Sequence, residues 1–275
     1  FAVSWGCGVI RHASRTLPLP SMPVKETPVK KTPVRGVTPP APDTYIDTYI
    51  ATYIVSDVHL GNRHCQRENF LRFIDQLPDS ARLVLNGDIV DEPDDPLSAE
   101  DEQIVDRLVE ESHRRPVVWV YGNHDETVAI QDPGQIQFVE RWAIDDRLLV
   151  MHGDEHDGVM PRHGLFKKIF KSLHRYRVAL GFADVHVADY AKRWGFLYRV
   201  LTEHVADKAL RLAAKEGFGA ITCGHTHAPV DLTVDGRRYL NTGCWTESPA
   251  YYVGVSPDRI EHHPFPDEPP QDPMH

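Results

Sequence analysis

The first half of the sequence alternates between two patterns of apolar and polar positions. Short apolar runs rich in β-branched residues cover residues 52–56, 81–85 and 117–121, which predicts three buried strands. Between these runs, apolar residues recur at helical spacing over 66–77 and 99–112. Strands that alternate with amphipathic helices are typical of βαβ units, so we expect an α/β fold with a largely parallel sheet.

The second half of the sequence predicts hairpins instead of βαβ units. Asp145-Asp146 and Asp235-Gly236 are turn sequences that separate short apolar runs. A helical block from about 165 to 215 interrupts these strands. We therefore expect the second half to supply antiparallel strands to a second sheet. The predicted strands are 137–142, 147–151, 220–223, 230–234, 237–240, 250–255 and 259–263.

Five of the predicted strands end in a cluster of polar residues. Asp57 and His59 leave the first strand at positions i and i+2, which point to the same side of an extended chain. Ligands of an open α/β sheet gather beyond the carboxyl ends of its strands, so we expect the clusters to meet. The clusters are Asp57 with His59, Asp88 with Asp91, Asn123 with His124, His152 with Asp154, and His225 with His227.

The residue types in these clusters indicate a metal site. Mixed Asp, Asn and His ligands suit Mn²⁺, Fe or Zn²⁺ in open coordination, whereas the sequence has no cysteine cluster for a thiolate zinc site. There are enough ligands for two divalent ions, with Asp88 as the natural bridge because its loop lies between the others in chain order. Two ions can share a hydroxide that attacks phosphorus, which removes the need for a serine or cysteine nucleophile.

Composition narrows the class of protein. The chain has 275 residues, 41% of them hydrophobic, which suffices for a large domain with a full core. Its formal net charge of -10 argues against general nucleic-acid binding. The four cysteines show no disulfide spacing, and no apolar run approaches the roughly 18–20 residues of a membrane span. We therefore expect a cytoplasmic protein.

The two ends of the chain differ in composition from the rest. Residues 1–43 are rich in Pro, Lys, Thr and Ser, and residues 265–275 are rich in Pro and acidic residues, so both segments are predicted to be disordered. We interpret the arm at 1–43 as an inert tail, with contact to an acidic surface as the alternative. The folded domain is expected over residues 44–264.

The motifs DVH, GDxxD, GNHD, HGD and GHTH follow one another in this order within residues 52–263. In this set the chain resembles the calcineurin-like metallophosphoesterase superfamily. The resemblance implies a sandwich of two mixed β-sheets flanked by helices, with a helical insert at about 161–215 as a lid. By motif it also implies one metal site formed by Asp57, His59, Asp88 and His227, and a second formed by Asp88, Asn123, His152 and His225.

The resemblance also implies roles for residues beside the metal ions. His124, next to Asn123, takes the family's catalytic position beside the phosphoryl group, where it stabilises developing charge or protonates the leaving oxygen. Asp125 is expected to orient His124, and Asp154 is expected to contact the metal ligands without binding an ion itself. Asp91 is either a further orienting acceptor or a solvated loop carboxylate.

Further segments resemble one family within this superfamily. SDVHLG, HGDEHDG, GHTHAP and NTGCWTES are similar to segments of the UDP-2,3-diacylglucosamine diphosphatase-like family, which also carries a long helical insert between HGD and GHTH. Members that act on lipid A precursors commonly have Arg where this chain has His124. The resemblance implies a nucleotide lipid similar to UDP-diacylglucosamine as the substrate.

The start of the insert is basic in an acidic chain. Residues 161–177 contain six Lys or Arg, two His and no acidic residue, and their apolar residues recur every three or four positions. We interpret the segment as a lid that binds anionic headgroups or a diphosphate and contacts the inner membrane face. The alternative is an ordinary helix with a solvated basic face. The expected substrate contacts are Arg162, Lys167, Lys168 and Lys171.

Together these features predict a two-metal phosphohydrolase that cleaves a phosphoanhydride or phosphodiester by metal-bound hydroxide, with Mn²⁺ as the expected ion. One alternative is a phosphodiesterase or phosphatase that acts on soluble nucleotides or phosphoproteins. Another is an inactive scaffold, but all expected ligands are present, which favours the enzyme. We expect a phosphorylated small molecule or lipid as partner, and no nucleic acid.

Overall fold

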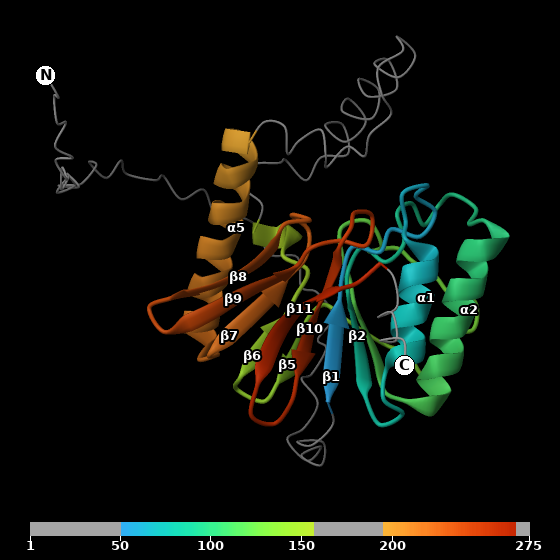
Figure 1. Cartoon of the computed structure of the whole chain (residues 1–275), viewed down its shortest axis with the longest axis horizontal. Coiled ribbons are helices and arrows are strands. Elements are labelled where there is room, and N and C mark those ends of the chain that lie inside the picture. Colours follow the sequence, from blue (N-terminus) through green and yellow to red (C-terminus); the bar gives the residue numbers. More distant parts are fainter. Residues whose placement is uncertain (1–50, 157–194, 268–275) are drawn as a thin grey trace, which may run out of the picture. The chain divides into compact units, whose positions relative to one another are not determined.

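The computed structural model describes residues 51–156 and 195–267, whose strands form two sheets (Figure 1). The larger sheet has six strands in the spatial order β11 (Ile260–Phe265), β10 (Ala250–Val255), β1 (Thr52–Val55), β2 (Arg82–Asn86), β3 (Val117–Val120) and β4 (Gln137–Val139). The smaller sheet has five strands in the order β5 (Trp142–Ile144), β6 (Leu148–Val150), β7 (Ala220–Cys223), β9 (Arg237–Thr242) and β8 (Pro229–Val234). Both sheets mix parallel and antiparallel pairs, as expected.

The larger sheet contains the βαβ units that the sequence predicts. Strands β1, β2, β3 and β4 pair in parallel, with α1 (Arg67–Gln76) and α2 (Ala99–Arg114) as the crossovers before β2 and β3. The apolar face of α1 buries Phe70, Phe73 and Ile74. The residues that follow the parallel strands therefore meet at one edge of the sheet.

Polar contacts cap the N-terminus of helix α2 and fix the helix to α1. Its first residue follows Ser98, whose hydroxyl accepts a hydrogen bond from the backbone N–H of Asp101 at 3.2 Å. The carboxylate of Asp101 is buried and accepts two hydrogen bonds from the guanidinium of Arg67, at 2.7 and 2.9 Å. This bidentate pair joins α1 to α2 beside the sheet edge where the polar clusters lie.

Alternating side chains place the two sheets face to face. Ile54 of β1 and Val84 of β2 lie in an apolar cluster with Val150 and Leu240 of the smaller sheet, whereas Val55 faces the cluster that includes α1 and α2. On the outer side of the smaller sheet, α5 (Gly195–Glu216) packs on β7 and β9 (Figure 1). The described layers are thus helices, sheet, sheet and helix, which is the predicted sandwich.

Two predicted pairings in the second half are wrong. The segment 137–142 is not one arm of a hairpin, because β4 joins the larger sheet and only β5 pairs with β6. The exposed residues Glu140 and Arg141 separate these two strands. The last hairpin, formed by β10 and β11, joins the larger sheet through β1 instead of the smaller one. Apolar alternation encodes the buried face of a strand but not the sheet that it joins.

Several predictions lie outside the described residues. These are the arm at 1–43, nearly all of the tail, and the insert up to residue 194, including the basic residues Arg162, Lys167, Lys168 and Lys171. The end of the predicted helical block is α5, which finishes at Glu216. Among the helices in 51–156 and 195–267, none has the length and the apolar character that crossing a membrane requires.

Candidate metal centre

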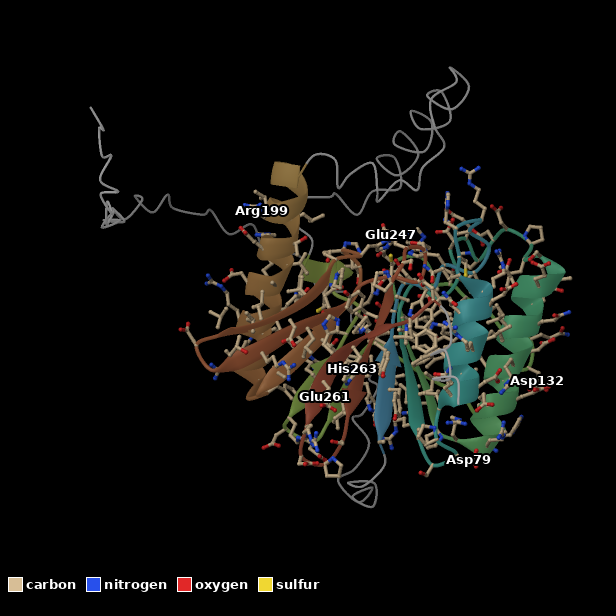
Figure 2. All side chains as sticks on the ribbon, viewed as in Figure 1. Asp79, Asp132, Arg199, Glu247, Glu261 and His263 are labelled. Carbon is tan, nitrogen blue, oxygen red and sulfur yellow. The ribbon has the colours of Figure 1, made fainter. Side chains whose placement is uncertain are left out.

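The five predicted clusters follow the carboxyl ends of five strands. Asp57, Asp88 and Asn123 come after β1, β2 and β3, which run parallel in the larger sheet. His152 and His225 come after β6 and β7, which run parallel in the smaller sheet. Figure 2 shows Glu247 at the end of the molecule toward which β1 points, while Asp79 lies toward the opposite end.

Backbone conformation sets the predicted ligands apart from the rest of the described chain. Seven described non-glycine residues have positive φ: Asp57, His59, Asp88, Asp145, His225, His227 and Asp235. Asp145 and Asp235 lie in hairpin turns, where such values are common. The other five are predicted ligands, with φ between 54° and 62°. Each left-handed residue costs about 1–3 kcal/mol, so the fold maintains this loop geometry against its local preference.

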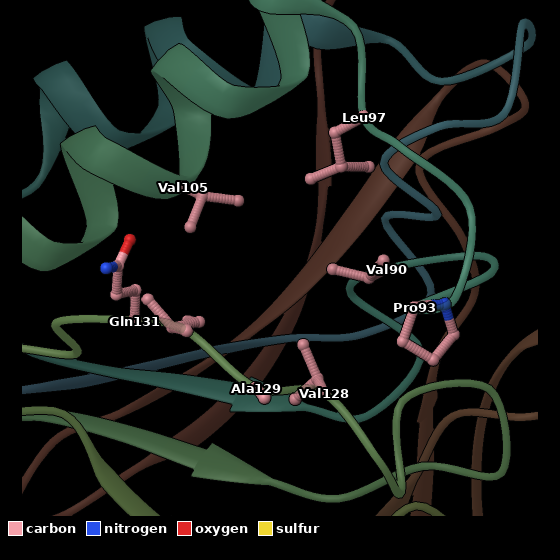
Figure 3. A pocket seen from close by; sticks show the side chains of 8 residues that line it. Val90, Pro93, Leu97, Val105, Val128, Ala129 and Gln131 are labelled. Atoms are coloured by element: carbon pink, nitrogen blue, oxygen red, sulfur yellow. The ribbon is translucent and has the colours of Figure 1, made fainter.

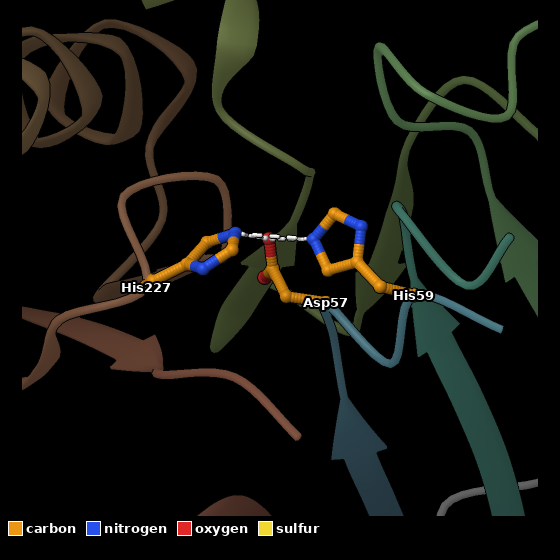
Figure 4. A group of neighbouring side chains, drawn as sticks. All are labelled: Asp57, His59 and His227. Atoms are coloured by element: carbon orange, nitrogen blue, oxygen red, sulfur yellow. Dashed lines mark hydrogen bonds and ion pairs between the residues drawn. The ribbon is translucent and has the colours of Figure 1, made fainter. Parts of the chain in front are cut away.

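Asp57, His59 and His227 form the first ligand group, which we name the buried cluster (Figure 4). The Nε2 atoms of His59 and His227 lie 3.1 Å apart, and Oδ1 of Asp57 lies 3.2 Å from Nε2 of His227. Two ligand atoms at about 2.1 Å from one ion and near the tetrahedral angle are about 3.4 Å apart. All three side chains are buried, and their atoms fit a single divalent ion.

Asp88, His152 and His225 form the second group, which we name the open cluster because His225 is only half-buried. Oδ2 of Asp88 lies 3.2 Å from Nε2 of His152. Nδ1 of His225 lies 2.9 Å from Oδ1 of Asn123, which brings the predicted asparagine ligand to the same group. The donor set of carboxylate, imidazole and amide oxygen suits Mn²⁺, Fe or Zn²⁺.

Hydrogen bonds fix the tautomers of two histidines in these clusters. Nδ1 of His152 lies 2.9 Å from the carbonyl oxygen of Asn86, which can only accept, so Nδ1 carries the proton. Nδ1 of His59 lies 2.9 Å from the Asp91 carboxylate, which imposes the same tautomer. In both residues Nε2 then faces the other ligands of its cluster, as metal binding requires.

Asp91 contacts both a predicted ligand and the predicted catalytic histidine. Its Oδ1 lies 2.9 Å from Nδ1 of His59 and 3.2 Å from Nδ1 of His124, and its carbonyl oxygen lies 2.7 Å from the same His124 atom. Burial would raise the pKa of Asp91, but hydrogen bonds from His124 and His59 lower it, so the carboxylate stays ionised. Of the two interpretations of Asp91, the contacts favour the orienting acceptor.

Asp125 does not make the contact that the sequence suggested. Its carboxylate accepts hydrogen bonds from the backbone N–H groups of Ile89 and Gly122, at 2.9 and 2.7 Å, and from the indole of Trp119 at 3.0 Å. It thus joins the loops after β2 and β3, while Asp91 contacts the His124 ring. Burial and the charge of Asp88 raise the pKa of Asp125.

Charges in and beside the open cluster influence one another strongly. Burial would lower the pKa of His152, but the carboxylate of Asp88 raises it to about 10. Burial would raise the pKa of Asp88, but the imidazoles of His152 and His124 hold it well below its usual range. Asp154, in the short η1 helix (Asp154–His156), adds a smaller contribution that also raises the pKa of His152. A concentration of buried carboxylates that attract positive charge is what a cation site requires.

Sequence reasoning missed several polar residues that hold the ligand loops. The amide nitrogen of Asn86 donates to the Met151 carbonyl oxygen at 3.0 Å, and that of Asn241 donates to the Gly224 carbonyl oxygen at 2.6 Å. A Cβ atom at Gly224 would overlap the Asp57 carboxylate, so only glycine fits there. The sequence signal that could have identified Asn86 and Asn241 is a polar residue in the last two positions of a strand.

A small apolar cavity adjoins the loops that follow β2 and β3 (Figure 3). Its volume is about 200 Å³. Val90 directly precedes Asp91 in the sequence, Pro93 follows it by two positions, and the N–H of Val128 donates to the carbonyl oxygen of Asp125 at 3.1 Å. The lining residues are Val90, Pro93, Leu97, Val105, Val128, Ala129, Ile130 and Gln131. Both loops thus contribute to the ligand groups and to the cavity.

Known proteins resemble the chain in sequence and in fold. UDP-2,3-diacylglucosamine hydrolase of Shewanella halifaxensis (strain HAW-EB4) is 26% identical over 227 residues, which cover 75% of this chain and 94% of the relative. Among solved structures, Yfce, a phosphoesterase from E. coli, has 17% identity and a TM-score of 0.39, over 78% of this chain and 100% of that chain. The phosphopantetheinyl hydrolase PptH from Mycobacterium tuberculosis has 15% identity and a TM-score of 0.35, over 83% and 98%.

The family match covers more than half of the chain. The sequence model of the calcineurin-like phosphoesterases matches residues 50–229, which span the loops of all five polar clusters. Members act with divalent metal ions, and the described residues provide three groups of suitable ligands, the third of which consists of His59, Asp91 and His124. The chain therefore belongs to the calcineurin-like phosphoesterase family and is a metal-dependent phosphoesterase.

Proposed function

We propose that the protein is a two-metal hydrolase that cleaves the phosphoanhydride bond of a nucleotide lipid similar to UDP-diacylglucosamine. The two-metal part of the proposal rests on two of the three ligand groups, the buried cluster and the open cluster. Asp57, His59 and His227 would hold one ion, and Asn123, His152 and His225 the other. Asp88 is proposed as the bridge, and Mn²⁺ as the ion. When bound, the two ions supply an activated water and a positive clamp on the phosphoryl oxygens.

The side chain of His124 is proposed to protonate the leaving oxygen. Its Nδ1 donates to the Asp91 carbonyl oxygen, so the proton available for transfer lies on Nε2 of the imidazolium form. Nε2 is 3.9 Å from Oδ2 of Asp88, which places it beside the proposed bridge. The ionised Asp91 carboxylate stabilises the imidazolium until the proton is transferred.

Two observations support a substrate with an apolar part. The relative from Shewanella halifaxensis is a UDP-2,3-diacylglucosamine hydrolase, and the coverage extends over nearly its whole length. The apolar cavity that Val90 and Val128 help to line has a volume of about 200 Å³. A cavity of about 150 Å³ holds one benzene molecule, so this cavity suits a segment of one acyl chain. The basic residues of the insert are proposed to bind the diphosphate.

A substrate comparison tests this proposal. The Mn²⁺-loaded protein would be assayed with UDP-diacylglucosamine in detergent, with the same nucleotide sugar without acyl chains, and with a soluble aryl phosphodiester. We expect the highest kcat/KM for the acylated substrate and release of UMP from it. Equal kcat/KM for the acylated and deacylated compounds would contradict the lipid substrate. No hydrolysis of any phosphorus compound by the metal-loaded protein would contradict the enzyme itself.

A second candidate function is a phosphodiesterase or phosphatase on soluble nucleotides or phosphoproteins. The observation that favours it is His124, which stands where lipid-acting members commonly carry Arg. An imidazole can donate a proton to a poor leaving group, as simple monoesters and diesters require. The same assay separates the two functions, because a soluble nucleotide hydrolysed faster than the lipid would favour the second.

A further inference from the structure

A chain of two buried hydroxyl groups lies behind the Asp57 carboxylate. The Ser56 hydroxyl donates a hydrogen bond to Oδ2 of Asp57 and also contacts the Thr242 hydroxyl. Ser56 follows β1 in the larger sheet, and Thr242 is the last residue of β9 in the smaller sheet. All three residues are fully buried. The hydroxyl chain therefore connects the two sheets directly at a predicted metal ligand.

Counting protons assigns a direction to this chain. Each hydroxyl has one proton, and that of Ser56 is used in the bond to Asp57, so Thr242 must be the donor in the contact between the hydroxyls. The only other acceptor recorded for Thr242 within the described residues is the Cys223 carbonyl oxygen, at a longer 3.4 Å. Hydrogen bonds that point the same way polarise one another, which strengthens the bond that reaches the carboxylate.

The surrounding contacts separate the two oxygens of Asp57. Oδ2 accepts from Ser56, whereas the His225 backbone nitrogen lies 3.1 Å from both oxygens. Oδ1 lies 3.2 Å from Nε2 of His227 and 3.9 Å from Nε2 of His59, among the other ligand atoms of the buried cluster. One oxygen thus faces the hydroxyl chain, and the other faces the position of an ion.

The backbone of Asp57 is held as firmly as its side chain. Its N–H donates to the Gly87 carbonyl oxygen at 3.0 Å, and its own carbonyl oxygen accepts from Trp245 N–H at 2.9 Å. With φ at 54°, Asp57 needs such support to keep its left-handed conformation. Because the backbone is fixed, the rotation of the carboxylate depends on the donors to its oxygens, and the Ser56 hydroxyl donates to Oδ2 alone.

We infer that Ser56 and Thr242 are positioning residues that direct Oδ1 of Asp57 at the metal ion and set the affinity of the buried cluster for that ion. The inference rests on the proposed two-metal centre and adds residues that the family's ligand motifs do not contain. Losing a group that orients a ligand typically weakens metal affinity by about 10–100-fold. The open cluster shares neither hydroxyl, so its affinity should not change.

The test is equilibrium Mn²⁺ binding to the full chain, followed by electron paramagnetic resonance of the free ion. We expect two binding events in the wild-type protein, and Thr242→Val should weaken one of them by about 10–100-fold while the other stays unchanged. Ser56→Ala removes the other hydroxyl and should weaken the same event. Thr242→Ser keeps the hydroxyl and should bind both ions as the wild type does.

Thr222→Val is the matched control. Thr222 is a fully buried threonine on β7, and its hydroxyl makes no hydrogen bond to the residues that the structure describes. We expect this variant to bind both ions with wild-type affinity. Thermal unfolding of each variant without metal shows whether that variant folds. If Thr242→Val does not fold, Ser56→Ala serves as the test.

The outcomes separate this inference from the proposed function. A wild-type protein that binds fewer than two Mn²⁺ ions would overturn the two-metal centre and the inference with it. Two bound ions in both the wild type and Thr242→Val, with equal affinities, would overturn the inference alone. The inference would also be overturned if Thr222→Val weakened Mn²⁺ binding as much as Thr242→Val does. Weakening of both binding events by Thr242→Val would overturn it too.

Discussion

The buried cluster and the open cluster use similar ligands in different surroundings. In the buried cluster, all three side chains are buried and a hydroxyl chain holds Asp57 from behind. In the open cluster, His225 is half-buried, and the nearby His124 keeps 16% of its side-chain surface exposed. From this comparison we propose that the buried cluster holds its ion firmly and that the substrate enters beside the open cluster.

Both clusters take ligands from loops of both sheets, but the sets of loops differ. The buried cluster combines the loop after β1 with the loop after β7, so it spans both sheets. The open cluster also spans both, but it adds Asn123 and His124 from the loop that the apolar cavity adjoins. His124 also lies beside the buried cluster, because Asp91 contacts both His59 and His124.

Removing the carboxylate that is proposed as the bridge should have the largest effect. Asp88→Asn should lower kcat/KM by more than about 10⁴-fold, because two ions together bring the pKa of a shared water from 15.7 towards about 7. The measurement is turnover with metal content determined on the same samples. Circular dichroism should show a wild-type fold, and wild-type activity in this variant would contradict the role of Asp88 as a bridge.

Replacing the predicted proton donor should have a smaller effect and leave the metals in place. His124→Asn should lower kcat by about 10²–10⁴-fold, the usual contribution of a general acid. Metal content should stay at two ions, because His124 lies outside the proposed ligand sets. An activated aryl ester, whose leaving group needs no proton, should lose much less activity. An equal loss on activated and unactivated substrates would contradict the role as an acid.

Replacing Asp91, which contacts both His59 and His124, should moderately weaken both metal binding and proton transfer. Asp91→Asn should lower kcat/KM by about 10–100-fold, because it weakens the contacts to His59 and to His124. Asp95→Asn is the control, since Asp95 is an exposed carboxylate on the same loop. Metal titration and kinetics together separate the contributions. Loss of neither metal affinity nor turnover would show that the orientation of the two rings is set elsewhere.

Much of the metal centre could be predicted from the sequence, because its ligands are encoded locally. Asp57 and His59 directly follow an apolar run, and each later ligand follows another such run, so chain order and residue type were sufficient. The support behind the ligands could not be predicted in the same way. Ser56 and Thr242 are 186 positions apart, and nothing in either segment indicates that they touch.

Prediction of the fold from the sequence has the same limit. The strands β7 and β10 were predicted with their observed bounds, since each is a short apolar run between turn residues. The partners of β4 and β10 were not, because an apolar run fits either sheet equally well. Pairing is decided by the completed core, in which residues distant in sequence pack together.

The most substrate-specific effect is predicted at the apolar cavity, and it tests whether this cavity belongs to the open side of the centre. Val128→Phe should fill part of the cavity and lower kcat/KM for an acylated substrate while leaving the deacylated analogue unchanged. Burying one methylene group contributes about 0.8 kcal/mol, or about fourfold, so excluding two or three should cost about 15- to 60-fold. Val234→Phe, at a position on β8 that is 49% exposed, is the matched control and should change neither substrate. An equal loss with both substrates would mean that the larger side chain disturbs the loop of His124 instead of an acyl-binding cavity.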